Sequence, residues 1–206
     1  MYSLNIPISE ESIRNLHVGD PVRLNGIIMT GRDAAHKWFY ETFIHPTHQP
    51  TASDQEVYAA IKPFLENGVI YHCGPVVAGG GDEPYRFVAA GPTTSIREEP
   101  YQGEVMRHFN LRGVIGKGGM GAATLAACSD VPAVYFHASG GAAALLACAV
   151  RRVLGVYKLE FGVPEALWVI EVQDFPVVVT MDAHGRSLHD EIEQQSQEVL
   201  NRLLTS

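Results

Sequence analysis

The sequence predicts an α/β fold with a central, largely parallel sheet. Short strands and helices alternate from end to end. In the second half, the order strand, glycine loop, helix occurs twice, over 113–128 and 133–153, which is typical of βαβ units. Ligands of open α/β sheets bind at the carboxyl edge, so we expect the glycine loops at that edge. The length of 206 residues suits a single domain covering 1–206.

The first half contains signals for helices, loops and a hairpin. Ser9 followed by acidic residues predicts the start of a short helix. The pair Asn25-Gly26 indicates a turn or bulge inside a strand over 21–29. The remaining expected elements are helices over 32–43 and 54–66, a loop over 45–51, and strands over 69–72 and 85–90 that form an antiparallel pair around a glycine turn at 78–82.

In the second half, each βαβ unit has the same parts. We expect strands over 113–116 and 133–136, each followed by a glycine loop. The helices after them cover 121–128 and the Ala/Leu-rich stretch that ends at Val153. Two more strands, 167–172 and 177–181, flank Asp174-Phe175-Pro176, and a closing helix covers 187–204.

Composition excludes several classes of protein. Fifteen Lys and Arg against 23 Asp and Glu give a formal net charge of −8, which argues against a nucleic-acid-binding surface. No apolar run approaches the roughly 20 residues of a membrane-spanning helix, and the N-terminus lacks the features of a signal peptide. We therefore expect a cytoplasmic protein.

The three cysteines, Cys73, Cys128 and Cys148, are widely spaced. Their odd number and the lack of a Cys-x-x-Cys pair exclude a disulfide framework and a self-contained four-cysteine metal site. We expect reduced and mostly buried thiols, and no metal ligand in this chain.

The segment Gly116-Lys117-Gly118-Gly119-Met120-Gly121 matches the pattern G-x-G-x-x-G between a strand and a helix. This pattern allows a stand-alone nucleotide-binding α/β module as an alternative function. However, no acidic residue ends the next strand, as a dinucleotide site requires, and no Ser or Thr follows the lysine, as a Walker A loop requires. A small-anion site or a tight turn with a solvated lysine remains.

Two further segments combine a cation with polar side chains. In Gly91-Pro92-Thr93-Thr94-Ser95-Ile96-Arg97, Thr93 and Arg97 would share one face of a helix and could bind a planar carboxylate. Alternatively, a hydroxyl caps the helix and Arg97 pairs with Glu98 or Glu99 on the surface. In Arg32-Asp33-Ala34-Ala35-His36, the acid could orient the imidazole three residues later, or simply open a helix beside an exposed histidine.

Together with Cys73-Gly74-Pro75 and Asp174-Phe175-Pro176, these motifs occur in one order. With these motifs in this order, the chain closely resembles the β subunit of class I iron–sulfur-dependent hydro-lyases over nearly its whole length. These enzymes are the fumarate hydratases and L(+)-tartrate dehydratases. The resemblance implies a swivelling β/β/α domain. It also implies an α subunit that holds a [4Fe–4S] cluster, an α2β2 assembly, and hydration of fumarate to malate or dehydration of tartrate.

The resemblance also implies roles for individual residues. Thr93 is the expected base and His36 an expected active-site residue, and the carboxylates of a C4 dicarboxylate are expected to bind Arg32, Arg97 and Lys117. Supporting roles are expected for Asp33, Thr94 and Gly118, which adjoin these residues. The stretch 45–67 departs from shorter members and is expected to be an insertion at the rim. A regulatory relative without activity is a further option, which the retained cations disfavour.

Overall fold

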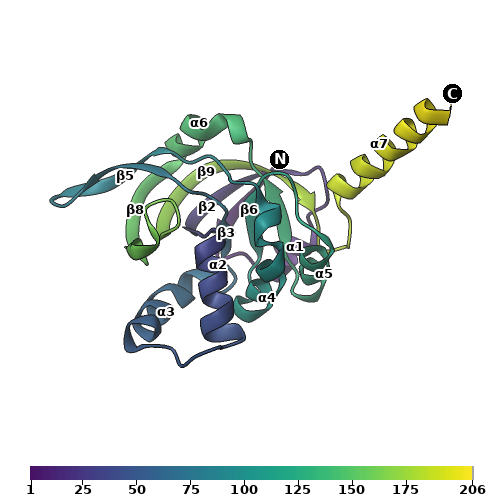
Figure 1. Cartoon of the computed structure of the whole chain (residues 1–206). Helices are drawn as coiled ribbons and strands as arrows, with labels where there is room; N and C mark the ends of the chain where they lie inside the picture. Colours follow the sequence, from purple (N-terminus) through teal and green to yellow (C-terminus); the bar gives the residue numbers. More distant parts are fainter. Residues whose placement is uncertain (206) are drawn as a thin grey trace.

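The computed structural model describes residues 1–205 and shows a mixed α/β architecture (Figure 1). Within these residues, a seven-stranded sheet has the order β1-β2-β3-β6-β7-β9-β8, and β4 and β5 form a separate two-stranded ribbon. The strands are β1 (Tyr2–Ile6), β2 (Pro21–Thr30), β3 (Val69–Tyr71), β4 (Val76–Gly80), β5 (Glu83–Ala89), β6 (Gly113–Gly116), β7 (Val134–His137), β8 (Val150–Tyr157) and β9 (Leu167–Met181).

The sheet is only partly parallel, whereas the sequence predicted a largely parallel one. Neighbouring strands from β1 through β2, β3 and β6 to β7 run parallel. Strand β9 is antiparallel to β7, β8 and β2. Because β9 pairs with both β7 and β2, the sheet closes on itself through β2, β3, β6, β7 and β9.

The helices lie on both sides of the sheet. They are α1 (Glu10–Arg14), α2 (Asp33–Phe39), α3 (Ala52–Leu65), α4 (Glu99–Phe109), α5 (Ala122–Asp130), α6 (Ala143–Cys148) and α7 (Leu188–Thr205). Figure 1 shows α2 to α5 gathered on one side and α6 with the β4–β5 ribbon on the other. Side chains that alternate along the strands fill two separate cores between these layers.

Strand β3 shows this alternation and corrects one prediction. Val69 and Tyr71 point into the core shared with α6, while Ile70 points into the core shared with α2 to α5. A strand that is buried on both faces belongs in the middle of a sheet. The predicted antiparallel pairing of 69–72 with 85–90 is therefore wrong, and the partner of β5 is β4, with the glycine turn between them.

The predicted helix up to Val153 is also wrong, because α6 ends at Cys148 and β8 begins two residues later. The β-branched residues Val150, Val153 and Val156 favour a strand, and each packs against the core through its pairing with β9.

The strands predicted at 167–172 and 177–181 form one strand, β9. Asp174, at φ +53°, forms a bulge where two β9 residues oppose Asn25 of β2, and the side chain of Asn25 accepts a hydrogen bond from the Asp174 amide at 2.9 Å. The bulge predicted at Asn25-Gly26 is thereby confirmed.

Other elements differ at their ends. Ser9 caps α1 as predicted, and α3 begins two residues earlier than predicted, at a capping box formed by Thr51 and Asp54. The α-helix predicted over 32–43 ends at Phe39 and continues as a π-helical turn, Tyr40–Ile44. Helix α7 projects from the body of the molecule (Figure 1). None of the helices within residues 1–205 has the length and apolar character that a membrane crossing needs.

Gly116, the last residue of β6, leaves no room for a side chain. A Cβ atom there would overlap Ser95 Oγ and lie 2.7 Å from the hydroxyl of Tyr135. We expect Gly116→Ala to lower the free energy of unfolding by about 2–4 kcal/mol, since it overpacks a buried polar contact. Urea unfolding of the chain measures this. The control is Gly141→Ala, where a Cβ meets nothing within 4 Å, and an equal loss in both variants would contradict the analysis.

Candidate active site

The predicted site residues follow the ends of neighbouring parallel strands. Arg32 comes two residues after β2, and Lys117 directly follows β6. The segment that contains Thr93 lies between them, because the Thr93 amide donates to the carbonyl of His72 at 2.7 Å and Thr94 bridges to Lys117. Three distant stretches of sequence therefore meet at one edge of the sheet.

Arg32 precedes α2 in an extended conformation and is held by the segment before β9. Its Nη1 lies 3.2 Å from Glu165 Oε1 and 3.5 Å from the carbonyl oxygen of Pro164. The other Glu165 oxygen accepts from the Ala34 amide in the first turn of α2 at 3.2 Å. Gly74 lets the guanidinium group approach, since a Cβ there would be 2.5 Å from Nη1. Glu165 therefore fixes both the arginine and the start of the helix.

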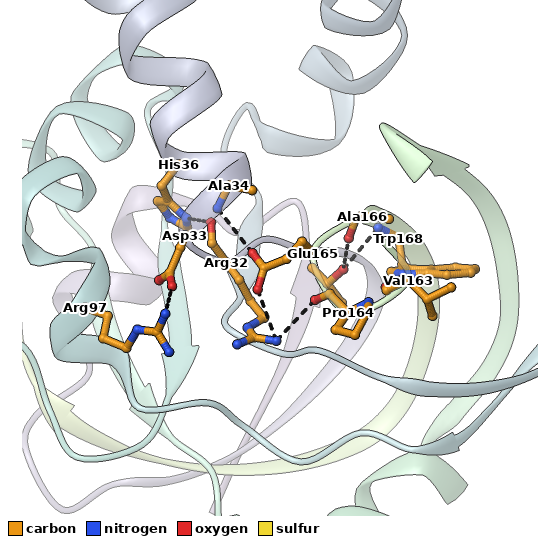
Figure 2. A network of polar contacts seen from close by, with 11 residues as sticks. Arg32, Asp33, Ala34, His36, Arg97, Val163, Pro164, Glu165, Ala166 and Trp168 are labelled. Carbon is orange, nitrogen blue, oxygen red and sulfur yellow. Dashed lines mark hydrogen bonds and ion pairs between the residues drawn. The ribbon is translucent and has the colours of Figure 1, made fainter. Parts of the chain in front are cut away.

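Arg97 forms an ion pair with Asp33. It does not pair with Glu98 or Glu99, the surface partners that the sequence allowed. Its Nη2 donates to Asp33 Oδ2. Figure 2 shows the guanidinium groups of Arg97 and Arg32 on the same side of the start of α2. A depression of about 470 Å³ lies beside Arg97, lined by Asp33, Ala34, Lys37, Arg97 and Tyr101. The outer part of the site is therefore cationic and open.

The prediction that Thr93 and Arg97 share one face of a helix is wrong. Thr93 is half-buried in an extended segment, and the helix that follows is a 3₁₀ turn, Ser95–Glu98, which runs into α4. Within the described residues, the hydroxyl of Thr93 makes no hydrogen bond, whereas its amide is bonded to His72. Thr93 thus has a fixed backbone and a free side-chain oxygen.

His36 lies beneath the site and is fully buried. Its Nδ1 is 2.9 Å from the Arg32 carbonyl oxygen, and its Nε2 is 2.8 Å from Gln102 Oε1. Asp33 therefore does not orient the imidazole by a hydrogen bond, although the sequence allowed this, because it binds Arg97 instead. Burial lowers the pKa of His36, so the ring is neutral at ordinary pH.

The network continues through Gln102 into the sheet. His72 Nε2 lies 2.7 Å from the same Gln102 oxygen, and His72 Nδ1 is 2.8 Å from Ser95 Oγ. The hydroxyl of Tyr135 donates to Ser95 Oγ at 2.8 Å. Burial also lowers the pKa of His72. Four elements are thus joined under the site by one buried polar network.

Lys117 and the glycines after it form the third part of the site. Lys117 is half-buried, and its side chain lies over Gly140, where a Cβ would be 3.2 Å from Lys117 Cδ. No carboxylate within residues 1–205 forms an ion pair with it. Gly118 and Gly119 have φ angles of +81° and +79°, which glycine adopts without strain.

The helix after the glycine loop does not offer its N-terminus to a ligand. The carboxylate of Glu99 accepts hydrogen bonds from the amides of Gly121, Ala123 and Thr124 at 2.8, 3.0 and 3.3 Å. These amides are the groups that would bind a phosphate. The alternative of a stand-alone nucleotide-binding module therefore has no support in the geometry.

The cysteines do not fit a metal cluster. Cys73 and Cys128 are buried in different cores, and Cys148 is exposed. Burial raises the pKa of both buried thiols to about 12, which keeps them protonated, while a metal ligand must be a thiolate. Within residues 1–205, no three His, Cys, Asp or Glu side chains converge on one point.

Sequence reasoning missed four residues of this site. Gln102 and Glu165 carry no local signal, because their partners are 66 and more than 130 residues away. Glu98 and Glu99 were considered only as surface partners of Arg97, but Glu98 is fully buried and Glu99 caps α5. The pattern Arg-Glu-Glu alone does not distinguish these roles.

Comparisons with known proteins identify the family of this chain. Residues 2–192 match the family model described as Fumarase C-terminus. The chain is 49% identical over 200 residues to a putative fumarate hydratase class I of Geobacillus stearothermophilus, covering 97% of this chain but only 36% of that relative. It is 39% identical over 206 residues to a putative L(+)-tartrate dehydratase subunit beta of Methanocaldococcus jannaschii, covering 98% of each chain.

A further relative is the L(+)-tartrate dehydratase subunit beta of Escherichia coli, which is 34% identical over 186 residues, or 90% of this chain and 85% of that one. The family match and these relatives cover nearly the whole chain. The chain therefore belongs to the Fumarase C-terminus family, whose members are hydro-lyases or their subunits.

Proposed function

We propose that this chain is the substrate-binding and proton-transfer subunit of a hydro-lyase that interconverts fumarate and malate or dehydrates tartrate. The observation that carries the proposal is that Arg32, Lys117 and the segment from Thr93 to Arg97 come together at one edge of the sheet, where the Thr93 hydroxyl makes no hydrogen bond within the described residues. Two guanidinium groups and an ammonium group suit a substrate with two carboxylates.

The cations also suit the reaction. When the C–H bond next to a carboxylate breaks, negative charge develops on that carboxylate as an enediolate, and the hydroxyl group leaves from the neighbouring carbon. Fixed cations stabilise this charge without reorganisation. Arg32 is fixed by Glu165, and Arg97 is fixed by Asp33. Two residues hold the backbone at Lys117: Thr94 bridges to it, and Gly118 follows it with a positive φ angle.

We assign the proton transfer to Thr93 and a positioning role to His36. The Thr93 oxygen is free of intramolecular bonds, whereas both ring nitrogens of His36 are engaged in a buried network. A threonine hydroxyl is a weak base at neutral pH, and a nearby positive charge would favour its deprotonated form. Lys117, which has no carboxylate partner in the described chain, can supply that charge.

We place the iron–sulfur cluster in a partner subunit, because the cysteines of this chain do not fit one. The names of the two relatives called subunit beta imply such a partner. We further propose that residues 1–206 act as one domain of the swivelling β/β/α type, which closes over the partner in an α2β2 assembly. The fused relative, in which this chain spans 36% of the length, is consistent with this division.

The proposed binding of the substrate carboxylates by Arg97 and Lys117 can be tested in the assembled enzyme, prepared anaerobically with the cluster-bearing partner. We expect Arg97→Ala and Lys117→Ala each to lower kcat/KM for fumarate or tartrate by about 30-fold or more, since each removes a charge-assisted bond worth roughly 2–3 kcal/mol. Arg186→Ala is the matched control for Arg97, because both arginines are exposed and paired with one carboxylate. Wild-type rates in both Arg97→Ala and Lys117→Ala would refute the proposed carboxylate binding.

The proton-transfer assignment can be tested by exchange of substrate hydrogen with deuterated solvent. We expect Thr93→Ala to abolish C–H exchange and Thr93→Ser to restore part of it, because serine keeps the hydroxyl group. His36→Asn should slow the reaction without abolishing exchange. Because His36 is neutral, the pH profile between about pH 7 and pH 9 should have the same shape in the wild type and in His36→Asn. Loss of exchange in His36→Asn with normal exchange in Thr93→Ala would reverse the two roles.

A further inference from the structure

One buried ionisable group of the site has no part in the chemistry above. The side chain of Glu98 is fully buried, and neither of its carboxyl oxygens makes a hydrogen bond of regular geometry within residues 1–205. Asp33 Oδ1 is also buried without a donor, although Asp33 Oδ2 binds Arg97. Asp33 lies close enough to Glu98 to interact with it, and three acceptor atoms without regular donors there would be very unfavourable if both carboxyl groups were ionised.

We propose that Glu98 carries a proton that it shares with Asp33, and that Glu98 thereby acts as a positioning residue for Arg97. A protonated carboxyl group is a donor, so it can bond to the unpartnered oxygen of Asp33 and remove the conflict. The pair then has one negative charge, which matches the single guanidinium group of Arg97.

The surroundings of Glu98 favour the protonated form. Burial, followed by the hydrogen bond and the negative charge of Asp33, raises the pKa of Glu98 to about 8, while the backbone amide of Glu98 itself and, to a smaller extent, Arg97 oppose this rise. Tyr135, from β7, is within range of the charge of Glu98, but its hydroxyl donates to Ser95 and is neutral, since burial raises its pKa. Gln102, on the same helix as Glu99, contacts His36 and His72, which burial keeps neutral. Among these groups, Arg97 is the one cation.

The consequence for substrate binding rests on the proposed function. Above about pH 8, loss of the shared proton leaves two negative charges beside Arg97. They would hold the guanidinium more tightly and repel an incoming dicarboxylate. Binding of the substrate, and so KM, would become pH-dependent through a residue that does not touch the substrate.

Thermal unfolding of the full chain tests the shared proton without any activity. A carboxyl group whose pKa is raised on folding stabilises the protein fully below its unfolded pKa, and this stabilisation is lost as the pH rises to the folded pKa. We therefore expect the Tm of the wild type to fall relative to Glu98→Gln between about pH 5 and pH 8 and then to level off. Glutamine is neutral and still donates to Asp33.

The control is Glu56→Gln, an exposed glutamate on α3, whose Tm difference from the wild type should not change over this range. A Tm difference that is the same at every pH for Glu98→Gln would overturn the proposal. A Tm of the wild type that rises with sodium or potassium, and not with protons, would also overturn it, because a bound cation would then bridge the carboxylates.

A second measurement uses only the wild-type chain, so it does not depend on the folding of a variant. The infrared spectrum of the wild-type chain with ¹³C-labelled glutamate should contain a protonated-carboxyl band at pH 7 that carries the isotope shift and disappears above about pH 9. Absence of this shifted band at pH 7 would refute the shared proton.

In the assembled enzyme, we expect KM for the dicarboxylate to rise about fivefold between pH 7 and pH 9 in the wild type and to stay level in Glu98→Gln, with kcat following the same pH profile in both. An equal rise in both enzymes would refute the positioning role. An assembled enzyme that acts on neither fumarate nor tartrate would refute the proposed function, while the thermal and infrared results would still decide the shared proton.

Discussion

The parallel pairing of β2, β3, β6 and β7 is the constraint on which the site depends. Parallel strands end at the same edge, so the residues that follow them are brought together whatever their distance in the sequence. Arg32 follows β2, and Lys117 follows β6. Arg97 lies on no strand, and its ion pair with Asp33 brings it to the same edge.

Beneath this edge, the buried network limits how the histidines can be protonated. A carbonyl oxygen only accepts, so His36 must donate from Nδ1 to the Arg32 carbonyl. The Nε2 of a neutral His36 is then an acceptor and needs a donor from Gln102. The two ends of an amide are nearly equal in shape, and the amide nitrogen of Gln102 otherwise has no partner. With that nitrogen toward the rings, one side chain donates to both His36 and His72.

The sequence predicted the parts of this protein better than their connections. Glycine loops, caps and the bulge at Asn25-Gly26 are local, because the residues that produce them are neighbours. Pairing partners are not local: the apolar stretch of β3 looks the same whether it pairs with β5 or with β6. The Ala/Leu-rich run before β8 favoured a helix by composition, but packing against β9 decided where the helix ends.

The same limit applies to the site. The sequence motifs and the resemblance they carry singled out the three cations, and the structure brings their segments to one edge of the sheet, while their roles stay predictions. The ion pairs of the two arginines could not be predicted, because Glu165 and Asp33 are far in sequence from the arginines they bind. The adjacent pair Glu98-Glu99 likewise does not indicate that one carboxyl group is buried and the other caps α5. Of the three predicted site cations, Arg32 and Arg97 are already paired with carboxylates, and Lys117 has no carboxylate partner within residues 1–205. A dicarboxylate bound as proposed would therefore have to compete with Glu165 and Asp33 for the guanidinium groups, and the proposed proton of the Asp33–Glu98 pair would set how strongly Asp33 competes.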